Sequence, residues 1–563
     1  MKQSQIEIAK QQIKMIITDA LGRLVASGTV PSEPLPAFTV ESTNDSAHGD
    51  FATNVSLVCA KTFHKSPRDI ANLLVAEIDL TESYFEKVEA AGPGFINFFL
   101  NDFWFASTVK SVIKQGDDYG KTDYGKNKSV LIEFVSANPT GPMHIGNARG
   151  GAIGDTLASV LSYAGYDAKR EFYVNDAGNQ IEKFATSLEV RYLQLYKSGI
   201  EMPEDAYHGA DITAHAENFA KEFGDGFVDS TPEERRNALV EFALPKNIEG
   251  LRVDLERYRI IYDNWFLESS VHKSGDVGRV IEKFKESGYT YSQDGALWFK
   301  ATEFGCDQDF VLVRSNGIPT YVVPDIAYHY NKLVTRNFDT AIDILGADHH
   351  GYVPRMKAAL KALGIDENRL KVIIMQMVRL VKDGDTYKLS KRSGKAITLN
   401  DLLDEVPIDA ARFFFNLRDP NTHLDFDIDL AISESSSNPV YYCQYAYARI
   451  CSIINNMKDE GVEIKDLSEN ELTVLSTPEE QALIRFIAKF PDEINMSAKE
   501  LDPSKMTRYC LELAGLFHKF YTVCRVKGMQ ENILQARLNL LLATKITLKN
   551  LLTLLKINTP EKM

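Results

Sequence analysis

Residues 130–165 constrain the fold of this chain more than any other segment. They read VLIEFVSANPTGPMHIGNARGGAIGDTLASVLSYAG, an apolar run followed by a loop rich in proline and glycine and then by a helical pattern. The spacing predicts a buried strand and a helix that begins at or just before His144 and ends near Gly165, since glycine tolerates the left-handed backbone that closes a helix. Three glycines lie inside this helix: Gly150, Gly151 and Gly154. Each costs about 1 kcal/mol relative to alanine, so close packing or a ligand must require their small size.

The start of this helix is a candidate phosphate site, because free N–H groups and the helix dipole attract anions there. His144 and Asn147 are three residues apart and project from one face of the first turn. Gly146 between them leaves room for a flat base to approach the backbone. A histidine in an isolated HxGN pattern is more often a helix cap or a core residue, so a second motif must decide.

That second motif is TYKLSKRSGKAITL, about 240 residues downstream. It places a group of polar and cationic residues on a glycine-punctuated loop: Lys388, Ser390, Lys391 and Arg392. Such a cluster is usually a solvated turn. Beside an anion-binding helix start, however, it supplies movable charges for the β- and γ-phosphates as pyrophosphate leaves, which adenylyl transfer requires.

The pattern along the chain predicts an α/β protein of three domains. Residues 1–115 indicate a small α+β unit with a helix to Val25, a helix around 50–64 and a strand pair near 87–100. In residues 116–430 short apolar runs alternate with helices, which favours a parallel, Rossmann-like sheet covered on both faces, with a helical insertion at about 185–290. The runs are VLIEFV, AKREFYV, FVLVRS, TAIDIL and KVIIMQMVRLV. Residues 431–563 have helical periodicity throughout.

Composition bounds the partners. The chain has 563 residues, 44% hydrophobic and 25% charged, as in globular proteins, and its net charge of −15 argues against a protein that coats nucleic acid indiscriminately. Residues 501–563, however, hold ten Lys and Arg against four Asp and Glu, a local charge of +6 that leaves −21 for the remainder. A cationic C-terminal region therefore remains available for one kind of folded RNA.

Other patterns argue against metal and membrane. The six cysteines are scattered without a CxxC pair, which predicts a reducing compartment and no structural zinc. No stretch approaches about 20 apolar residues and the N-terminus lacks a signal-peptide pattern, so we expect a cytoplasmic protein without a membrane span. His349 and His350 are adjacent; on a strand they would point to opposite faces, and no third ligand is suitably spaced, so no metal site is predicted.

HIGN and KLSKR resemble the HIGH and KMSKS signatures of class I aminoacyl-tRNA synthetases. Further blocks resemble bacterial-type arginyl-tRNA synthetases in the family's order and over nearly the whole chain, among them REFYVNDAGNQ, VLVRSNGIPTYVVPDIAYH, LGADHHGYVPRMKAA and NPVYYCQYAYARI. The resemblance implies ATP-dependent activation of L-arginine, transfer to the 3′ end of tRNA(Arg), Mg²⁺ carried with ATP, and activation that requires bound tRNA. In one departure, Asn147 replaces the second histidine of HIGH, which keeps an N–H donor but loses a cationic imidazole.

The resemblance also assigns residues to roles. It implies that four stabilise the transferring phosphate: His144, Asn147, Lys388 and Lys391. It places ATP against Pro142, His144, Gly146, Asn147, Ser390, Lys391 and Arg392. It places arginine against Glu133, Asn138, Tyr321 and Asp325, and it implies that His349 touches the adenylate region at the arginine site. Asp176 and Gln180 follow the second strand at the edge where such sheets bind ligands, so we expect them to line the arginine site, although a turn is the simple alternative.

The residue types at the arginine positions suit a guanidinium, which needs carboxylates and neutral acceptors. Tyr321 and Asp325 are four apart and share one side if TYVVPD is helical, and Pro324 suits a first helical turn. Asp325 alone could equally be a helix cap. Glu133 lies inside an apolar strand, where an unpaired carboxylate is costly, so a structural role is less easily assigned to it.

The helical C-terminal domain is the expected anticodon reader, with tRNA contacts at Tyr445, Arg449, Arg525 and Lys527. The tyrosines at 441, 442, 445 and 447 could stack on unpaired bases, but such a stripe is more often helix core, and at least two of the four are expected to be buried. The family assigns the N-terminal domain to the outer corner of the tRNA. A monomer is expected, because no leftover amphipathic seam requires a partner.

Two rival hypotheses remain open. A small-molecule nucleotidyltransferase shares an HxGH helix start on a similar sheet but would not need a basic helical domain of about 130 residues. A non-catalytic RNA-binding relative is disfavoured by intact His144, Lys388 and Lys391, while Asn147 keeps it open.

Overall fold

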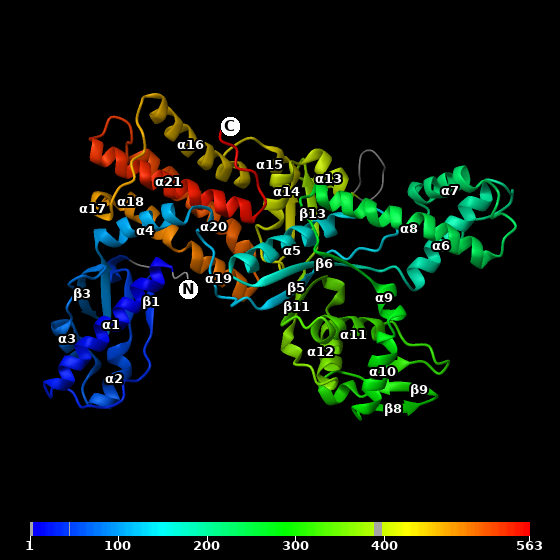
Figure 1. Cartoon of the computed structure of the whole chain (residues 1–563), viewed down its shortest axis with the longest axis horizontal. Coiled ribbons are helices and arrows are strands. Elements are labelled where there is room, and N and C mark those ends of the chain that lie inside the picture. The colour runs from blue at the N-terminus through cyan, green and yellow to red at the C-terminus, as the bar shows by residue number, and fades with distance from the viewer. Residues whose placement is uncertain (1–3, 44–45, 388–396) are drawn as a thin grey trace.

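A five-stranded parallel sheet forms the centre of the molecule (Figure 1). The computed structural model describes residues 4–43, 46–387 and 397–563. The strand order is β12-β11-β5-β6-β7. The strands are β5 (Ser129–Glu133), β6 (Asp167–Val174), β7 (Asn264–Leu267), β11 (Thr340–Gly346) and β12 (Leu370–Met375). Because every pairing is parallel, all five carboxyl ends meet at one edge, where open α/β sheets bind ligands. The prediction of a parallel sheet is confirmed.

Helix α5 (Ile145–Tyr163) follows β5 and packs on this sheet. His144 is its N-cap and Gly165, with a φ of +84°, lies just beyond its end, as predicted. A Cβ on Gly151 would lie 2.7 Å from Ile260 Cδ1, and one on Gly154 would collide with the Phe134 ring. Both glycines are therefore required by the close approach of α5 to the strand end and its neighbours.

Two groups of elements interrupt the sheet. The first is a helical lobe of α6 (Asn179–Gln194), α7 (Ala210–Phe223) and α8 (Pro232–Arg257), which has its own buried cluster and projects from one end of the molecule (Figure 1). The second comprises α9 (Glu268–Lys273), α10 (Asp276–Glu286), β8 (Thr290–Gln293), β9 (Ala296–Phe299), η3 (Ala301–Phe304), β10 (Phe310–Val313), α11 (Val322–Tyr330) and the π-helical turn η4 (Asn331–Thr335).

These two groups of elements differ in two ways from what the sequence pattern predicted. The range predicted as a helical insertion contains β7, which is the edge strand of the parallel sheet. The FVLVRS run was expected in the same sheet, but β10 pairs antiparallel with β9 in a separate three-stranded sheet. A four-residue strand such as β7 carries too little periodicity to distinguish it from the helices around it.

The remaining elements of the central region lead toward the C-terminal helices. They are η5 (Ala347–His349), α12 (Tyr352–Ala362), η6 (Glu367–Arg369), β13 (Val378–Lys382), β14 (Asp385–Thr386), α13 (Leu399–Glu405), α14 (Ile408–Phe415), β15 (Leu424–Asp427) and α15 (Ile428–Ile432). KVIIMQMVRLV thus supplies two strands, β12 in the parallel sheet and β13 in a small mixed sheet ordered β14-β13-β15.

The N-terminal unit is built on an antiparallel sheet ordered β1-β2-β4-β3. Its elements are α1 (Gln5–Ala26), β1 (Val40–Ser42), η1 (Ser46–His48), β2 (Phe51–Thr53), α2 (Val55–Phe63), α3 (Pro67–Glu77), β3 (Phe85–Ala91) and β4 (Phe95–Leu100). The predicted helix to Val25 and strand pair are confirmed. The predicted helix around 50–64 is wrong at its start, where β2 precedes α2.

Six helices form the C-terminal region, and no strand occurs in residues 428–563, all of which are described. They are α16 (Pro439–Asp459), α17 (Glu469–Leu472), α18 (Pro478–Ala488), α19 (Phe490–Glu500), α20 (Ser504–Val523) and α21 (Glu531–Leu554). The connector from the N-terminal unit, α4 (Asp102–Gln115) and η2 (Gly116–Asp118), packs against them: Asn550 donates to Gly116 O at 2.9 Å, and the buried Tyr119 donates to Ile487 O at 2.7 Å. Residues 114–128 (KQGDDYGKTDYGKNK), polar and glycine-rich like a linker, are therefore anchored to the C-terminal helices at Gly116 and Tyr119.

Candidate active site

The first turn of α5 presents an open anion-binding surface. His144 is exposed, and its backbone N–H donates to Asn147 Oδ1 at 3.0 Å. Because the amide oxygen makes this cap, the NH₂ group of Asn147 is the part available to donate to a ligand. Nothing lies within 4 Å of a Cβ placed on Gly146. The turn therefore has two side chains on one face and free space over the backbone between them.

The loop before α5 is strained. Val135 and Ser136 have φ values of +70° and +42°, which is costly for a β-branched residue such as valine. Ser136 Oγ donates to Glu133 Oε1 at 2.9 Å, and the Tyr262 hydroxyl donates to Phe134 O at 2.9 Å, so contacts hold the loop in place. Strain of this kind collects at functional sites, and this loop joins the end of β5 to the start of α5.

The KLSKR motif, Lys388 to Arg392, lies outside the described residues. The chain just after it lies against the start of α5: Thr398 forms an isolated β-bridge with His144, and Leu399 N–H donates to Met143 O at 2.9 Å. The described residues that follow the second motif are thus held beside the first motif.

A cavity of about 420 Å³ lies at the carboxyl edge of the sheet. It is lined by Phe310, Val311, Thr320, Tyr321, Val322, Asp325, Asp348, Gly351, Tyr352 and Arg355. Tyr321 and Asp325 lie at the start of α11 and line it together, as their spacing predicted. Burial, reinforced by Glu268 and Glu133 and opposed by His329, raises the pKa of Asp325 to about 7. This carboxyl lacks an adequate cation, and a cationic ligand would favour its ionised form.

Glu268 is an acid that the sequence patterns did not single out. It directly follows β7, half-buried, and burial raises its pKa. In the amide orientation that satisfies its neighbours, Asn175 donates to Glu268 Oε2 at 2.9 Å. The WFL run before it could have identified Glu268, since residues that follow strand ends lie at the ligand-binding edge of the sheet. That run, however, falls in the range predicted as a helical insertion.

Glu133 is not free to act as a lone carboxylate. The ammonium of Lys332, fully buried in η4, contacts both Glu133 Oε2 and Asp343 Oδ1, the latter at 2.8 Å. His329 Nε2 lies 2.7 Å from Asp343 Oδ2. Although burial disfavours charge, Lys332 and His329 hold the pKa of Asp343 low, and the two acids hold the pKa of Lys332 high. Glu133 therefore lies in an internally neutralised layer behind the cavity.

The other predicted arginine residues are dispersed. Asp176 Oδ1 accepts from Ser269 N–H at 2.7 Å and so fixes the start of α9. Gln180 accepts from the Tyr207 hydroxyl, and Asn138 is exposed in the loop before α5. None of the three lines the 420 Å³ cavity.

His349 lies at its edge, next to the lining residue Asp348, but in the 3₁₀ turn η5 and not on a strand, so the strand argument against a metal was wrong. In the described ranges, no group of three or more His, Cys, Asp or Glu is placed to hold a metal.

A second cavity of about 680 Å³ extends from the other side of the loop toward the helical lobe. Its lining includes Thr140, Gly141, Pro142 and His144 from the loop, Lys246, Asn247 and Asp254 from α8, and Thr398 and Asp401 at α13. Asn247 Nδ2 donates to Pro139 O at 2.9 Å and so ties α8 to the loop. His144 and Pro142 thus border a cleft shared by the sheet domain and the lobe.

A third cavity, of about 560 Å³, lies along α16 and contains the C-terminus. It is lined by Tyr445, Ala448, Arg449, Ser452, Asn455, Asn456, Asp459, Glu561, Lys562 and Met563. Tyr445 is 38% exposed and stacks on His518 with ring centroids 5.9 Å apart, while Arg449 donates to the Tyr521 hydroxyl at 2.7 Å. Arg525 and Lys527 lie outside this cavity, and Lys527 pairs with Glu460 at 2.5 Å.

The expectation that at least two of the four tyrosines are buried is wrong. Only Tyr447 is buried, while Tyr441 and Tyr442 are half-buried and Tyr445 is exposed. The packing of α16 against both α20 and α21 leaves the side that carries Tyr441 and Tyr445 open. Two parallel rings are therefore accessible on one face of the helix, with centroids 6.5 Å apart.

A helix start with an open first turn, an acid-lined cavity at the same sheet edge and a separate helical domain together fit a class I aminoacyl-tRNA synthetase. Residues 108–434 match the model of the class I tRNA synthetase (R) catalytic domain, residues 11–100 that of the arginyl tRNA synthetase N terminal domain, and residues 443–563 that of the DALR anticodon binding domain. The chain belongs to the arginyl-tRNA synthetases.

Individual relatives agree with this assignment. The chain is 53% identical over 558 residues to the arginine–tRNA ligase of Caldanaerobacter subterraneus and 50% identical over 560 residues to that of Acetivibrio thermocellus, each time over 99% of both chains. The arginyl-tRNA synthetase structure of Thermus thermophilus shares the fold with a TM-score of 0.74 at 21% identity, over 98% of this chain and all of that one. That of Plasmodium falciparum has a TM-score of 0.70 at 20% identity, over 98% and 99%. Among the residues described here, no helix is long and apolar enough to span a bilayer.

Proposed function

We propose that the protein is an arginine–tRNA ligase that activates L-arginine with ATP and transfers it to the 3′ end of tRNA(Arg). The observation that carries the substrate assignment is Asp325, a carboxyl with a pKa of about 7 in a cavity at the carboxyl edge of the sheet. A guanidinium supplies the cation that this carboxyl lacks. The arginine carboxylate attacks the α-phosphorus of ATP and pyrophosphate leaves; a ribose hydroxyl of the tRNA then attacks the carbonyl of arginyl-adenylate, loses its proton and expels AMP.

Neither step needs a side-chain nucleophile, so catalysis rests on positioning and charge stabilisation. His144, the NH₂ group of Asn147 and the N-terminus of α5 stabilise the phosphates, with the adenine ring over Gly146 and beside Pro142. Lys388 and Lys391, with Ser390 and Arg392, neutralise the departing pyrophosphate from the adjoining loop. Mg²⁺ enters with ATP, held by the phosphates.

The arginine site divides into contacts and supports. Tyr321, Asp325 and Glu268 hold the guanidinium. Glu133 and Asp176 act mainly as supports, since Lys332 neutralises the first and the start of α9 engages the second. His349 contacts the substrate from the mouth of the cavity, while Asn138 and Gln180 act from the loop before α5 and the start of α6.

The tRNA is held by two outer regions. Residues 431–563 read the anticodon loop, with Tyr445 and Arg449 in the α16 cavity, because an exposed ring and a guanidinium suit unpaired bases. Arg525 and Lys527 add positive charge around it. The N-terminal domain, residues 1–115, contacts the outer corner, the central domain spans 116–430, and arginine activation requires bound tRNA. We further infer that the protein works in the cytoplasm, where charging of tRNA(Arg) for translation takes place, and that it is a monomer.

Pyrophosphate exchange into ATP tests this function, measured with each amino acid in the presence and absence of tRNA. We expect exchange only when arginine is the amino acid supplied and tRNA is also present. Exchange that is indifferent to both would contradict the proposal. Lys391→Ala should lower the arginine-activation rate by well over tenfold; a rate within a few-fold of wild type would remove the loop from the mechanism.

A further inference from the structure

Two long helices, α8 from the helical lobe and α21 from the C-terminal region, end in the same backbone reversal. Past the end of each helix a backbone N–H donates back five residues at 2.8 Å, Ile260 to Leu255 and Ile557 to Leu552. Glycine is usual at the preceding position, which must adopt a left-handed conformation. Here those positions are Arg259, with a φ of +62°, and Lys556, with a φ of +55°. A strained cation at both places indicates that the side chains are needed.

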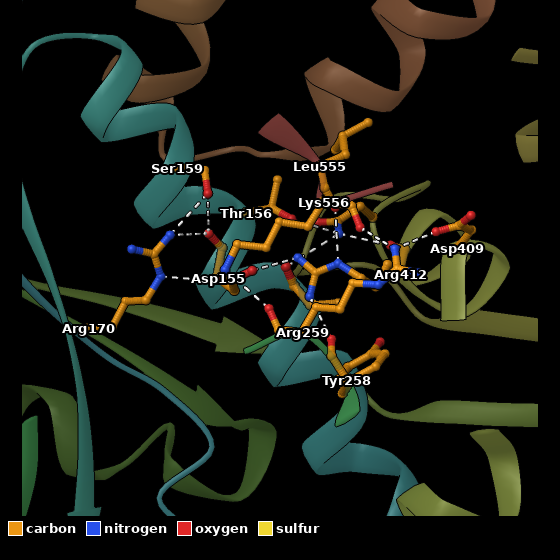
Figure 2. A network of polar contacts seen from close by, with 12 residues as sticks. Asp155, Thr156, Ser159, Arg170, Tyr258, Arg259, Asp409, Arg412, Leu555 and Lys556 are labelled. Carbon is orange, nitrogen blue, oxygen red and sulfur yellow. Dashed lines mark hydrogen bonds and ion pairs between the residues drawn. The ribbon is translucent and has the colours of Figure 1, made fainter. Parts of the chain in front are cut away.

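The two cations reach across to each other's backbone (Figure 2). Arg259 Nη1 donates to Lys556 O at 2.7 Å, and Lys556 Nζ donates to Arg259 O at 3.1 Å. The buried Arg412 of α14 lies between them and donates to Tyr258 O at 3.1 Å and to Leu555 O at 3.0 Å. Carbonyls at helix C-termini lack intrahelical partners and carry the negative end of the dipole. Arg259, Arg412 and Lys556, here called the clasp, thus join two helix ends from different regions.

On one side the clasp contacts α5, the helix that begins after His144. Asp155, fully buried in α5, accepts from Lys556 Nζ at 2.8 Å, Arg412 Nη2 at 2.6 Å and Arg170 Nε at 2.7 Å (Figure 2). The first turn of the same helix carries His144 and Asn147. Any displacement of the clasp therefore acts on the helix that binds ATP.

On the other side the clasp connects through Asp409 to α16, the helix that carries Tyr445 and lines the third cavity. Asp409 Oδ1 accepts from Arg259 Nη1 at 2.5 Å and from Asn558 N–H at 3.1 Å, and its Oδ2 accepts from Gln444 Nε2 at 2.9 Å. Gln444 also donates to Asn558 O at 2.9 Å, and it precedes Tyr445 in α16. The tail that begins at Lys556 ends in the α16 cavity.

We propose that Arg259 and Lys556 are positioning residues that couple occupancy of the α16 cavity to the placement of the ATP-binding turn of α5. The proposal rests on the function inferred above and identifies residues that connect the α16 cavity to the start of α5. A bound base that shifts α16 or the C-terminal tail moves Asp409 or Lys556, and the clasp transmits that movement to Asp155 because its groups are mutually bonded, with Arg412 and Asp155 fully buried and the Arg259 and Lys556 side chains 30% and 29% exposed.

Contact alone does not establish coupling, so the test is a cycle that combines a protein change with a tRNA change. Lys556→Gly removes the ammonium while suiting the left-handed backbone, so the fold should persist. Lys126→Gly is the matched control, since Lys126 is an exposed lysine with a φ of +50° that takes part in none of the hydrogen bonds of the clasp. Lys556→Arg tests rescue by a second cation.

Each enzyme is assayed for arginylation of tRNA(Arg) and of the same tRNA with its anticodon replaced. The ratio of the two kcat values should fall by about three- to tenfold in Lys556→Gly, which lies in the lower part of the range of couplings between residues in contact. It should stay at the wild-type value in Lys126→Gly and recover at least in part in Lys556→Arg.

A loss in Lys556→Gly that is equal for both tRNAs, an unchanged ratio, or a wild-type ratio of one would overturn the coupling. Thermal midpoints of the variants confirm folding. A wild-type enzyme that charges neither tRNA would overturn the proposed function itself, so the two failures can be told apart.

Discussion

Two carboxylates of the central domain, Asp155 and Asp325, have opposite surroundings. Asp155 is fully buried, yet three cations outweigh the effect of burial and lower its pKa. Asp325 lines a cavity in which burial and two neighbouring acids outweigh His329 and raise its pKa to about 7. Asp155 thus has its cations within the chain, whereas Asp325 lacks an adequate one, and the proposed function assigns that place to the guanidinium of arginine.

Removing the two charges should therefore change the free energy of unfolding by very different amounts. Asp155→Asn leaves Arg412, Lys556 and Arg170 without their counter-charge and should lower the free energy of unfolding by about 3 to 5 kcal/mol. Asp325→Asn removes an inadequately paired acid and should change it by less than about 1 kcal/mol. Urea unfolding of both variants measures the difference, and equal losses would break the comparison.

Function should reverse this order. Asp325→Asn should lower kcat/KM for arginine roughly 30- to 700-fold, which corresponds to about 2 to 4 kcal/mol for a lost charge contact. Pyrophosphate exchange with tRNA present measures it, and KM for ATP should be unchanged. Asp348→Asn is the control within the same cavity; its side chain is 83% exposed, so its effect should stay below about 1 kcal/mol. Equal effects of the two variants would argue against a special role for Asp325.

The pH dependence follows from the raised pKa of Asp325. The carboxyl is protonated below about pH 7, and a guanidinium binds the ionised form, so arginine must displace a proton at lower pH. KM for arginine should rise about tenfold for each pH unit below 7 and level off above it. Asp325→Asn should flatten this dependence. A wild-type KM that stays constant between pH 6 and 8 would contradict the assignment.

Glu268 should show the smallest effect. It is half-buried beside Asn175, burial raises its pKa, and its charge acts on Asp325 although it does not itself line the 420 Å³ cavity; the proposed function makes it a second acceptor for the guanidinium. Glu268→Gln keeps the shape and should raise KM for arginine about tenfold, or about 1.4 kcal/mol. The assay is again exchange with tRNA present. A variant with wild-type KM would restrict the charge contact to Asp325.

Local patterns predicted the parts of the site that are local. The helix from His144, its end at Gly165, the packing of Gly151 and Gly154, and the shared side of Tyr321 and Asp325 all follow from spacing within one turn or one strand–helix unit. These features depend on steric and periodic rules that operate over a few residues.

What the patterns missed depends on long-range contacts. Glu268 was overlooked because the four residues of β7 are too few to show the periodicity of a strand. The neutralisation of Glu133 by Lys332, 199 residues away, and the clasp around Asp155 require tertiary structure. The exposed side of α16 depends on which faces α20 and α21 cover, and periodicity alone does not say how many partners a helix has.

Calorimetry of arginine binding at pH 6.5, with tRNA present and in two buffers of different ionisation enthalpy, tests the central claim most directly. Because Asp325 is about three-quarters protonated at that pH, binding should release roughly 0.75 proton per arginine, and the release should disappear in Asp325→Asn. Binding of arginine without proton release in the wild type, or with the same release in the variant, would contradict the claim that Asp325 awaits the guanidinium.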